Sequence, residues 1–167
     1  MDLALAVRTS IALLACSLSA PALASYGTED QPEHELWVTS GFLSHHTQNS
    51  NRYNQHNDGL GVEWRWTADW QFNAGHYRNS VRHGSTYAQM GWTPLQTALP
   101  LDLRLRAGAS VGVINGYSRV RDGGYFATLV PMVTVETGRI GLNLVYVPTI
   151  GKRVDGAFAL QLKLHVN

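Results

Sequence analysis

Two short segments carry side chains that could perform acyl transfer. One contains the adjacent histidines His45 and His46, and the other contains Asn79 and Ser80. Acyl transfer needs a base that titrates near neutral pH, a hydroxyl that attacks or polarises the ester, and a group that orients the base. His46, Ser80 and Asn79 fit these three roles. Polar residues at such positions also commonly form solvated loops, so spacing alone leaves both interpretations open.

Adjacent histidines also raise the question of a metal site. Neighbouring residues of an extended strand point to opposite faces, so His45 and His46 cannot easily bind one ion together. No cluster of carboxylates accompanies them in the sequence. We therefore expect neither a metal ion nor another cofactor.

The elements that must position these side chains are predicted to be β-strands. Apolar and polar residues alternate with a period of two, and no segment sustains a helical period. The clearest case lies near the end of the chain, where Leu160, Leu162 and Leu164 alternate with Gln161 and Lys163. The predicted strands are 35–45, 59–67, 69–78, 85–93, 102–114, 124–136, 139–147 and 156–166.

The composition is polar without being charged. Charged residues make up 15% of the chain, and 13 Lys and Arg against 12 Asp and Glu leave a net charge of +1. A typical soluble domain has about 25% charged residues. The balanced charge argues against nucleic-acid binding, which needs a strongly basic face.

Eight strands of this length fit a transmembrane barrel. A tilted spanning strand needs about 9–11 residues, and an eight-stranded barrel has an interior that side chains just fill. Outer-membrane barrels turn their apolar face outward and carry aromatic girdles. We therefore predict an all-β, eight-stranded antiparallel up-and-down transmembrane β-barrel. The candidate girdle residues are Trp37, Trp64, Trp66, Trp70 and Tyr146.

The alternative fold is a soluble barrel of lipocalin type, with its apolar face inward. Its exposed face should be rich in Lys and Glu, whereas here that face would be mostly Gly, Ser and Asn. The pattern therefore favours the membrane barrel. Small interior residues would then leave room for an acyl chain, and the candidates are Gly61, Gly75, Gly91, Gly108 and Gly112.

Residues 1–24 are typical of a secretory signal peptide. Arg8 precedes an apolar run at 11–15, and the small-residue site Ala-Leu-Ala at 22–24 follows. Cleavage after Ala24 would leave residues 25–167 as the barrel, without any cysteine for a disulfide or a thiol nucleophile. A lipoprotein signal is the alternative, because Leu-Leu-Ala before Cys16 resembles a lipobox.

The connections between the predicted strands alternate in length. The long connections are 46–58, 79–84, 115–123 and 148–155, whereas the others are 68, 137–138 and a medium one at 94–101. Outer-membrane barrels have short periplasmic turns and long outer loops. This parity predicts that His46 and Ser80 share the outer rim and that both termini are periplasmic.

Several short motifs follow one another along residues 31–167. They are Gln-Pro-Glu-His at 31–34, Arg-Tyr-Asn at 52–54 with Gly59-x-Gly61, Tyr-Arg-Asn-Ser at 77–80 with Gly91-Trp92 eleven residues on, and Tyr-Val-Pro at 146–148. Their order and spacing resemble the PagP family, the outer-membrane lipid A palmitoyltransferases. The resemblance implies transfer of a palmitoyl-like chain from a phospholipid donor to a lipid A acceptor.

The resemblance also implies roles for individual residues. The family's histidine falls at His46 or His45, its serine at Ser80, and its acyl-length glycine at Gly91. Its aspartate falls at Asn79, and an amide can hold an imidazole but cannot stabilise imidazolium by charge. The chain also departs from the family before the first strand, where 25–34 is too short and polar for an amphipathic helix, and at its end, which lacks a terminal aromatic residue.

The sequence thus predicts a monomeric acyltransferase of the cell outer membrane. The catalytic candidates are His46, Asn79 and Ser80, and Gly91 is the candidate substrate-binding residue. Two alternatives stay open: a non-catalytic outer-membrane barrel that binds or anchors lipid, and a soluble periplasmic lipid-binding barrel.

Overall fold

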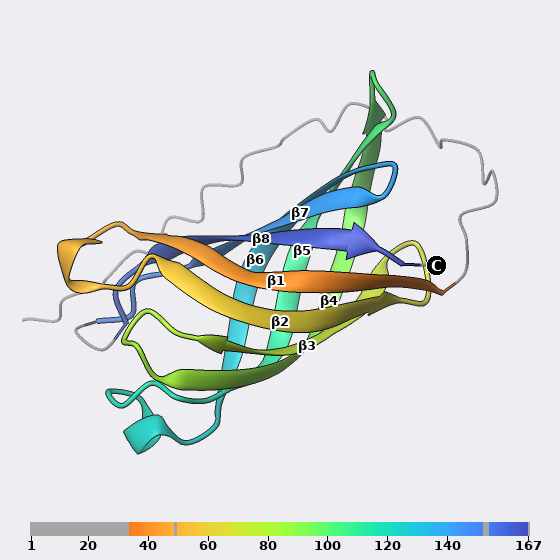
Figure 1. The fold of residues 1–167 in the computed structure, drawn as a ribbon. Helices are drawn as coiled ribbons and strands as arrows, with labels where there is room; N and C mark the ends of the chain where they lie inside the picture. Colours follow the sequence, from red (N-terminus) through yellow and green to blue (C-terminus); the bar gives the residue numbers. More distant parts are fainter. Residues whose placement is uncertain (1–33, 49, 152–153, 167) are drawn as a thin grey trace, which may run out of the picture.

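The computed structural model describes residues 34–48, 50–151 and 154–166. The predicted signal peptide at 1–24 and its lipoprotein alternative lie outside these residues. Eight antiparallel strands close into one barrel in the order β1 to β8, which confirms the predicted fold class (Figure 1). The elements are β1 (Glu35–His46), η1 (Ser50–Arg52), β2 (His56–Arg65), β3 (Trp70–Arg78), β4 (Gly84–Leu99), β5 (Leu103–Ile114), η2 (Arg121–Gly123), β6 (Phe126–Thr137), β7 (Ile140–Val147) and β8 (Ala157–His165).

The predicted strand ends agree with the structure to within three residues, except at the end of β4. The prediction ended that strand at residue 93 and assigned Pro94 to the connection, whereas a proline cannot donate a ladder hydrogen bond. In the structure the strand continues to Leu99, and the pairing with β5 shifts register between Trp92 and Leu95. Pro94 therefore lies in a bulge, where no ladder bond is needed. The medium-length connection predicted at 94–101 is consequently a short hairpin, which projects beyond its neighbours in Figure 1.

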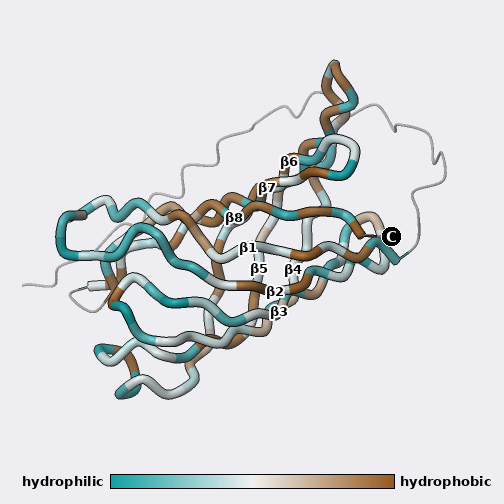
Figure 2. Tube along the Cα trace, viewed as in Figure 1, coloured by the Kyte–Doolittle hydropathy of each residue, from teal (hydrophilic) through white to brown (hydrophobic). Residues whose placement is uncertain are grey.

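The two faces of the strands have opposite polarity. Glu63 and Arg65 on β2 are buried in the interior, whereas Leu60 and Leu129 point outward and are 67% and 69% exposed. Figure 2 shows hydrophilic residues concentrated in the long loops. The apolar face is thus on the outside, which is the reverse of what the lipocalin-type alternative requires.

Outward-facing aromatic residues form two groups near the ends of the strands. The indole rings of Trp64 and Trp66 lie 5.5 Å apart, and those of Trp70 and Trp92 lie 6.1 Å apart, close to the short turn after β2. At the other end, the rings of Tyr146 and Phe158 lie 5.0 Å apart. These are the positions expected of two girdles.

Buried ion pairs fill the interior on the side of the short turns. Glu136 accepts from Lys163 at 2.7 Å and from Arg65 at 2.9 Å, and Arg106 Nε lies 3.3 Å from its other oxygen. Glu63 also pairs with both Lys163 and Arg65. The group spans β2, β5, β6 and β8, so it ties opposite walls of the barrel together.

Trp37 does not belong to a girdle, which corrects its prediction. Alternation along β1 places Glu35, Trp37 and Thr39 on the inner face, and Trp37 is 0% exposed. Its Nε1 donates to Glu35, and Lys163 Nζ lies 4.6 Å from the ring centroid. Trp37 therefore supports the buried charges through a cation–π contact.

The pairing of β6 with β7 covers only part of the two strands. It runs from Thr137 and Ile140 to Met132 and Val145 and is not continued in the half nearest the long loops. In that half β6 still pairs with β5, and β7 still pairs with β8. The next residue of β6 is Pro131, which has no N–H to donate. The wall of the barrel thus lacks ladder pairing between β6 and β7 in the half nearest the long loops.

The long connections share one end of the barrel and the short turns share the other. Residues 47–55, 79–83, 115–125 and 148–156 form the long set, and 66–69, 100–102 and 138–139 form the short set. The described ends of the chain lie with the short turns (Figure 1). No helix among the described residues is long and apolar enough to cross a membrane.

Replacing Glu136 by Gln should destabilise the barrel. The substitution leaves Lys163, Arg65 and Arg106 with one carboxylate fewer, and breaking a buried ion pair costs about 3–5 kcal/mol. Urea unfolding in detergent micelles measures the loss. The control is Asp58→Asn at an exposed position of β2, where about 0.5 kcal/mol or less is expected. Equal losses in the two variants would contradict this role.

Candidate functional site

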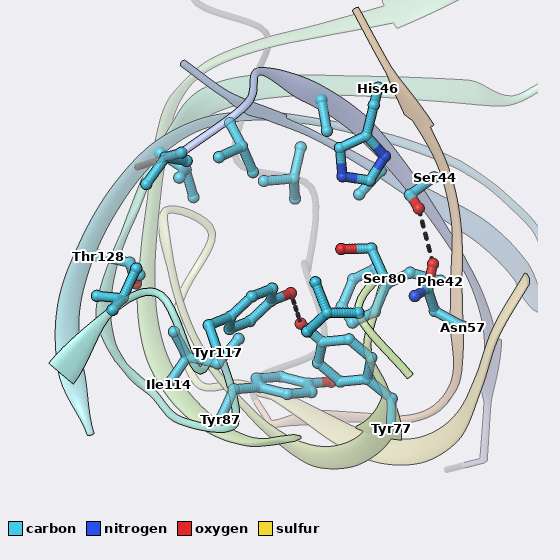
Figure 3. A pocket seen from close by; sticks show the side chains of 18 of the residues that line it. Phe42, Ser44, His46, Asn57, Tyr77, Ser80, Tyr87, Ile114, Tyr117 and Thr128 are labelled. Carbon is cyan, nitrogen blue, oxygen red and sulfur yellow. Dashed lines mark hydrogen bonds between the residues drawn. The ribbon is translucent and has the colours of Figure 1, made fainter. Parts of the chain in front are cut away.

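A cavity of about 210 Å³ occupies the half of the barrel nearest the long loops. Its walls are largely apolar, and its polar lining includes His46, Ser80 and Asp155. At the inner end, Tyr87 and Gln161 form a floor, since Gln161 Nε2 donates to Tyr87 Oη at 3.0 Å. Figure 3 shows the side chains gathered around this space. The apolar walls include Phe42, Tyr77, Ile114, Tyr117, Val130 and Val147.

The space beside the interior glycines Gly61, Gly75 and Gly91 is occupied by side chains of other residues and is not open. A Cβ on Gly61 or Gly75 would lie 2.7 or 2.8 Å from Tyr87 Oη, so both glycines make room for the tyrosine. A Cβ on Gly91 would lie 2.8 Å from Cγ of Gln71. Gly91 is therefore covered by Gln71 and does not itself line the cavity.

The structure distinguishes the two neighbouring histidines. His46 ends β1 and lines the cavity, with 7% of its surface exposed. Its Nδ1 is buried without a hydrogen-bond partner among the described residues. Figure 3 shows the imidazole ring pointing into the cavity. His45 instead lies on the outer face, in a groove with Leu144 and Phe158. The register shift of β1 between Thr39 and Phe42 changes which residues face inward, so that alternation after it places His46, and not His45, in the interior.

Ser80 reaches the same cavity from the turn between β3 and β4. It is 7% exposed, and Figure 3 shows its hydroxyl directed into the space that His46 also faces. The hydroxyl interacts with the phenol of Tyr117, whose pKa is raised chiefly by burial. The backbone carbonyl of Ser80 accepts from the N–H of Asn54, which ties this turn to the first loop.

Asn79 is buried, but its amide serves the turn rather than the cavity. Its Nδ2 donates to Ser85 Oγ and to the carbonyl of Gly116, both at 2.8 Å. Its Oδ1 accepts from the backbone N–H groups of Val81 and His83, both at 3.0 Å. Asn79 is not among the residues that line the cavity. It therefore holds in place the turn that carries Ser80.

Two further residues of the site come from other loops. The ring of Tyr53 stacks on that of His46, with centroids 4.0 Å apart and planes 17° apart. The phenol of Tyr53 donates a hydrogen bond to Asp155, and this bond is the main cause of the raised pKa of Tyr53. Local spacing cannot reveal the contact, because 102 residues separate Tyr53 from Asp155.

The arrangement suits chemistry on an ester with an apolar acyl chain. An imidazole and a hydroxyl face one largely apolar space, so a base and a hydrogen-bond donor are available where water is scarce. Within the described residues, no group of three or more His, Cys, Asp or Glu could hold a metal ion.

Comparisons with known proteins support the fold. No family model matches the sequence, and no curated protein does. One similar solved structure is described as "De novo design of transmembrane beta-barrels", with a TM-score of 0.53 and 13% identity. The match covers 83% of this chain and 100% of the designed chain. At this identity the likeness concerns the fold.

Replacing Asn79 by Asp, the residue of the resembled family, should destabilise this protein. A carboxylate cannot donate to Ser85 or to the carbonyl of Gly116, and an unsatisfied buried polar group costs about 1–3 kcal/mol. Unfolding in detergent micelles measures the change. Asn115→Asp is the matched control, because the Oδ1 of Asn115 accepts from Thr86 N–H and an aspartate keeps that acceptor. A more stable Asn79→Asp variant would refute the structural role.

Proposed function

We propose that this protein is an outer-membrane acyltransferase. It moves a palmitoyl-like chain from a phospholipid donor to a lipid A acceptor, as a monomer. The observation that carries the proposal is the placement of His46 and Ser80 around one apolar cavity inside a closed barrel. The motifs that resemble the lipid A palmitoyltransferases support the choice of donor and acceptor.

The membrane location rests on the outer surface of the barrel. Large apolar side chains cover that surface, and the two aromatic groups lie near its ends. The similarity to a designed transmembrane barrel adds support from the fold. Long loops face outward in outer-membrane barrels, so the cavity would open toward the outer leaflet, where lipid A lies.

The acyl chain enters from the lipid phase between β6 and β7. The two strands are unpaired beside the cavity, and Val130 and Val147, one from each edge, line it. A chain can therefore pass the wall there without breaking ladder hydrogen bonds. Once inside, it exchanges lipid contacts for apolar protein contacts, which costs little free energy.

In the reaction, His46 accepts the proton of the acceptor hydroxyl while the hydroxyl oxygen attacks the ester carbonyl. Ser80 donates to the oxygen that becomes negative, and Asn79 supports it by fixing the turn. Gly91 acts indirectly on the length of the acyl chain that the cavity holds. It leaves room for Gln71, and the amide of Gln71 contacts the sulfur of Met132, which lines the cavity.

The second candidate function is a non-catalytic barrel that binds or anchors lipid. The observation in its favour is that both polar atoms of the Asn79 side chain are engaged by the turn, by Ser85 and by Gly116, rather than by the cavity. The two functions differ in one measurable product, a lipid A molecule heavier by one acyl group.

Replacing His46 by Ala should abolish acyl transfer. Mass spectrometry of lipid A from cells with and without the protein detects the added acyl mass, and the variant should lose about 100-fold or more of the rate. His45→Ala is the matched control, because this neighbour lies on the outer face and should keep the rate. Absence of any added mass with the natural chain would favour the non-catalytic barrel. Full activity of His46→Ala would exclude His46 as the base.

Cross-linking β6 to β7 should block the entry of the chain. Pro131 and Tyr146 face outward one residue beyond the last pair, so cysteines at both positions can be joined by a bismaleimide reagent. Transfer should then fall to the level without the protein. Cysteines at Val133 and Leu144, which already pair, provide the control and should leave transfer unchanged. Full transfer by the barrel cross-linked at 131 and 146 would exclude this route.

A further inference from the structure

The loop between β7 and β8 brings a carboxylate to the catalytic histidine. His46 is the register partner of Ala157 at the start of β8. Asp155 comes two residues before Ala157 in the chain. Asp155 lines the same cavity and is close enough to His46 for direct electrostatic interaction. It is partly buried, and its Oδ2 accepts the hydrogen bond of the Tyr53 phenol.

Tyr53 connects this carboxylate to the imidazole. Its ring lies parallel to the ring of His46 with 4.0 Å between centroids. The face of an aromatic ring carries negative charge and attracts a cation. A hydrogen bond from the phenol to a carboxylate shifts electron density into the ring and strengthens that attraction. The stack also restricts rotation of the imidazole, whose far side points into the cavity (Figure 3).

Asn79 cannot supply this negative charge. Its side chain is a neutral amide, and its donors and acceptor are used within its own turn and on Gly116. In the described residues that line the cavity, Asp155 is the acidic side chain. Arg52 and Arg119 also lie near Tyr53. Asp155 thus acts on His46 directly and through the stacked ring of Tyr53.

We propose that Asp155, acting in part through Tyr53, is the positioning carboxylate of His46 and supplies the negative charge that the neutral amide of Asn79 cannot. This inference rests on the proposed acyltransferase function. Asp155 does not touch the reacting atoms. It holds the imidazole in one orientation and stabilises the imidazolium that forms during the reaction.

The proton balance shows when the carboxylate acts. The O–H bond of the acceptor breaks as its proton passes to His46, and a new ester bond forms between that oxygen and the acyl carbon. The bond from the acyl carbon to the glycerol oxygen of the donor then breaks. His46 returns the proton to that oxygen, which yields the acylated acceptor and a lysophospholipid. Imidazolium exists only between the two transfers, so Asp155 acts on kcat rather than on KM.

The test uses the full-length protein in detergent micelles, with palmitoyl-containing phosphatidylethanolamine and lipid A as substrates. Asp155→Asn keeps the volume and an acceptor for Tyr53 but removes the charge. Its kcat should fall about 100-fold with KM nearly unchanged, and Asp155→Glu should recover most of the loss. Asp122→Asn is the matched control, because this acid lies in the exposed η2 turn at positive φ, a conformation that Asn tolerates.

A double-mutant cycle separates the connection through Tyr53 from simple loop packing. Tyr53→Phe keeps the stacked ring and removes the hydroxyl that binds Asp155. It should lower kcat by no more than Asp155→Asn does, because the charge of Asp155 still acts directly on His46. The double variant should fall no further than Asp155→Asn alone, because the contribution through Tyr53 needs that charge. Losses that multiply in the double variant overturn the inference. So does a kcat loss that tracks a loss of thermal stability across the variants.

The outcomes for the natural chain and the variants are distinct. If the natural chain transfers no acyl group, the proposed function fails and this inference fails with it. If the natural chain is active and Asp155→Asn keeps its kcat, the inference alone is overturned and the acyltransferase function stands.

Discussion

The rest of the structure depends on the buried ion pairs in the half of the barrel nearest the short turns. An eight-stranded barrel has a narrow interior that side chains must fill, and charges placed there need partners of opposite sign. Glu63 and Glu136 pair with Lys163, Arg65 and Arg106 across the barrel. This network fills the interior at the end with the short turns. The cavity lies on its other side, toward the long loops.

The floor of the cavity follows from the same packing. The side chain of Tyr87 lies over the neighbouring strands β3 and β2 because Gly75 and Gly61 carry no Cβ, and Gln161 donates a hydrogen bond to its hydroxyl. Above this level the polar network gives way to apolar walls, and the unpaired edges of β6 and β7 meet the cavity there. The barrel thus combines a polar, ion-paired half with a largely apolar cavity.

The sequence was sufficient for the fold because each strand has one lipid-like and one polar face, and this alternation is a local property. The alternating loop lengths also place His46 and Ser80 at one rim, although the sequence left His45 open as an alternative to His46. It misjudged Pro94, because a bulge that absorbs a proline depends on the partner strand. It also misjudged Trp37, whose aromatic character matched a girdle but whose position in β1 faces the interior.

By itself, then, the sequence determined the number of strands, the polarity of their two faces and the end of the barrel at which the long loops lie. Period-two alternation and loop length express these features directly along the chain. Only the tertiary structure decided that the amide of Asn79 is used within its turn and that Tyr53 joins Asp155 to His46. The contact between Tyr53 and Asp155 links two loops far apart in the chain, and it forms because closure of the barrel brings β8 against β1.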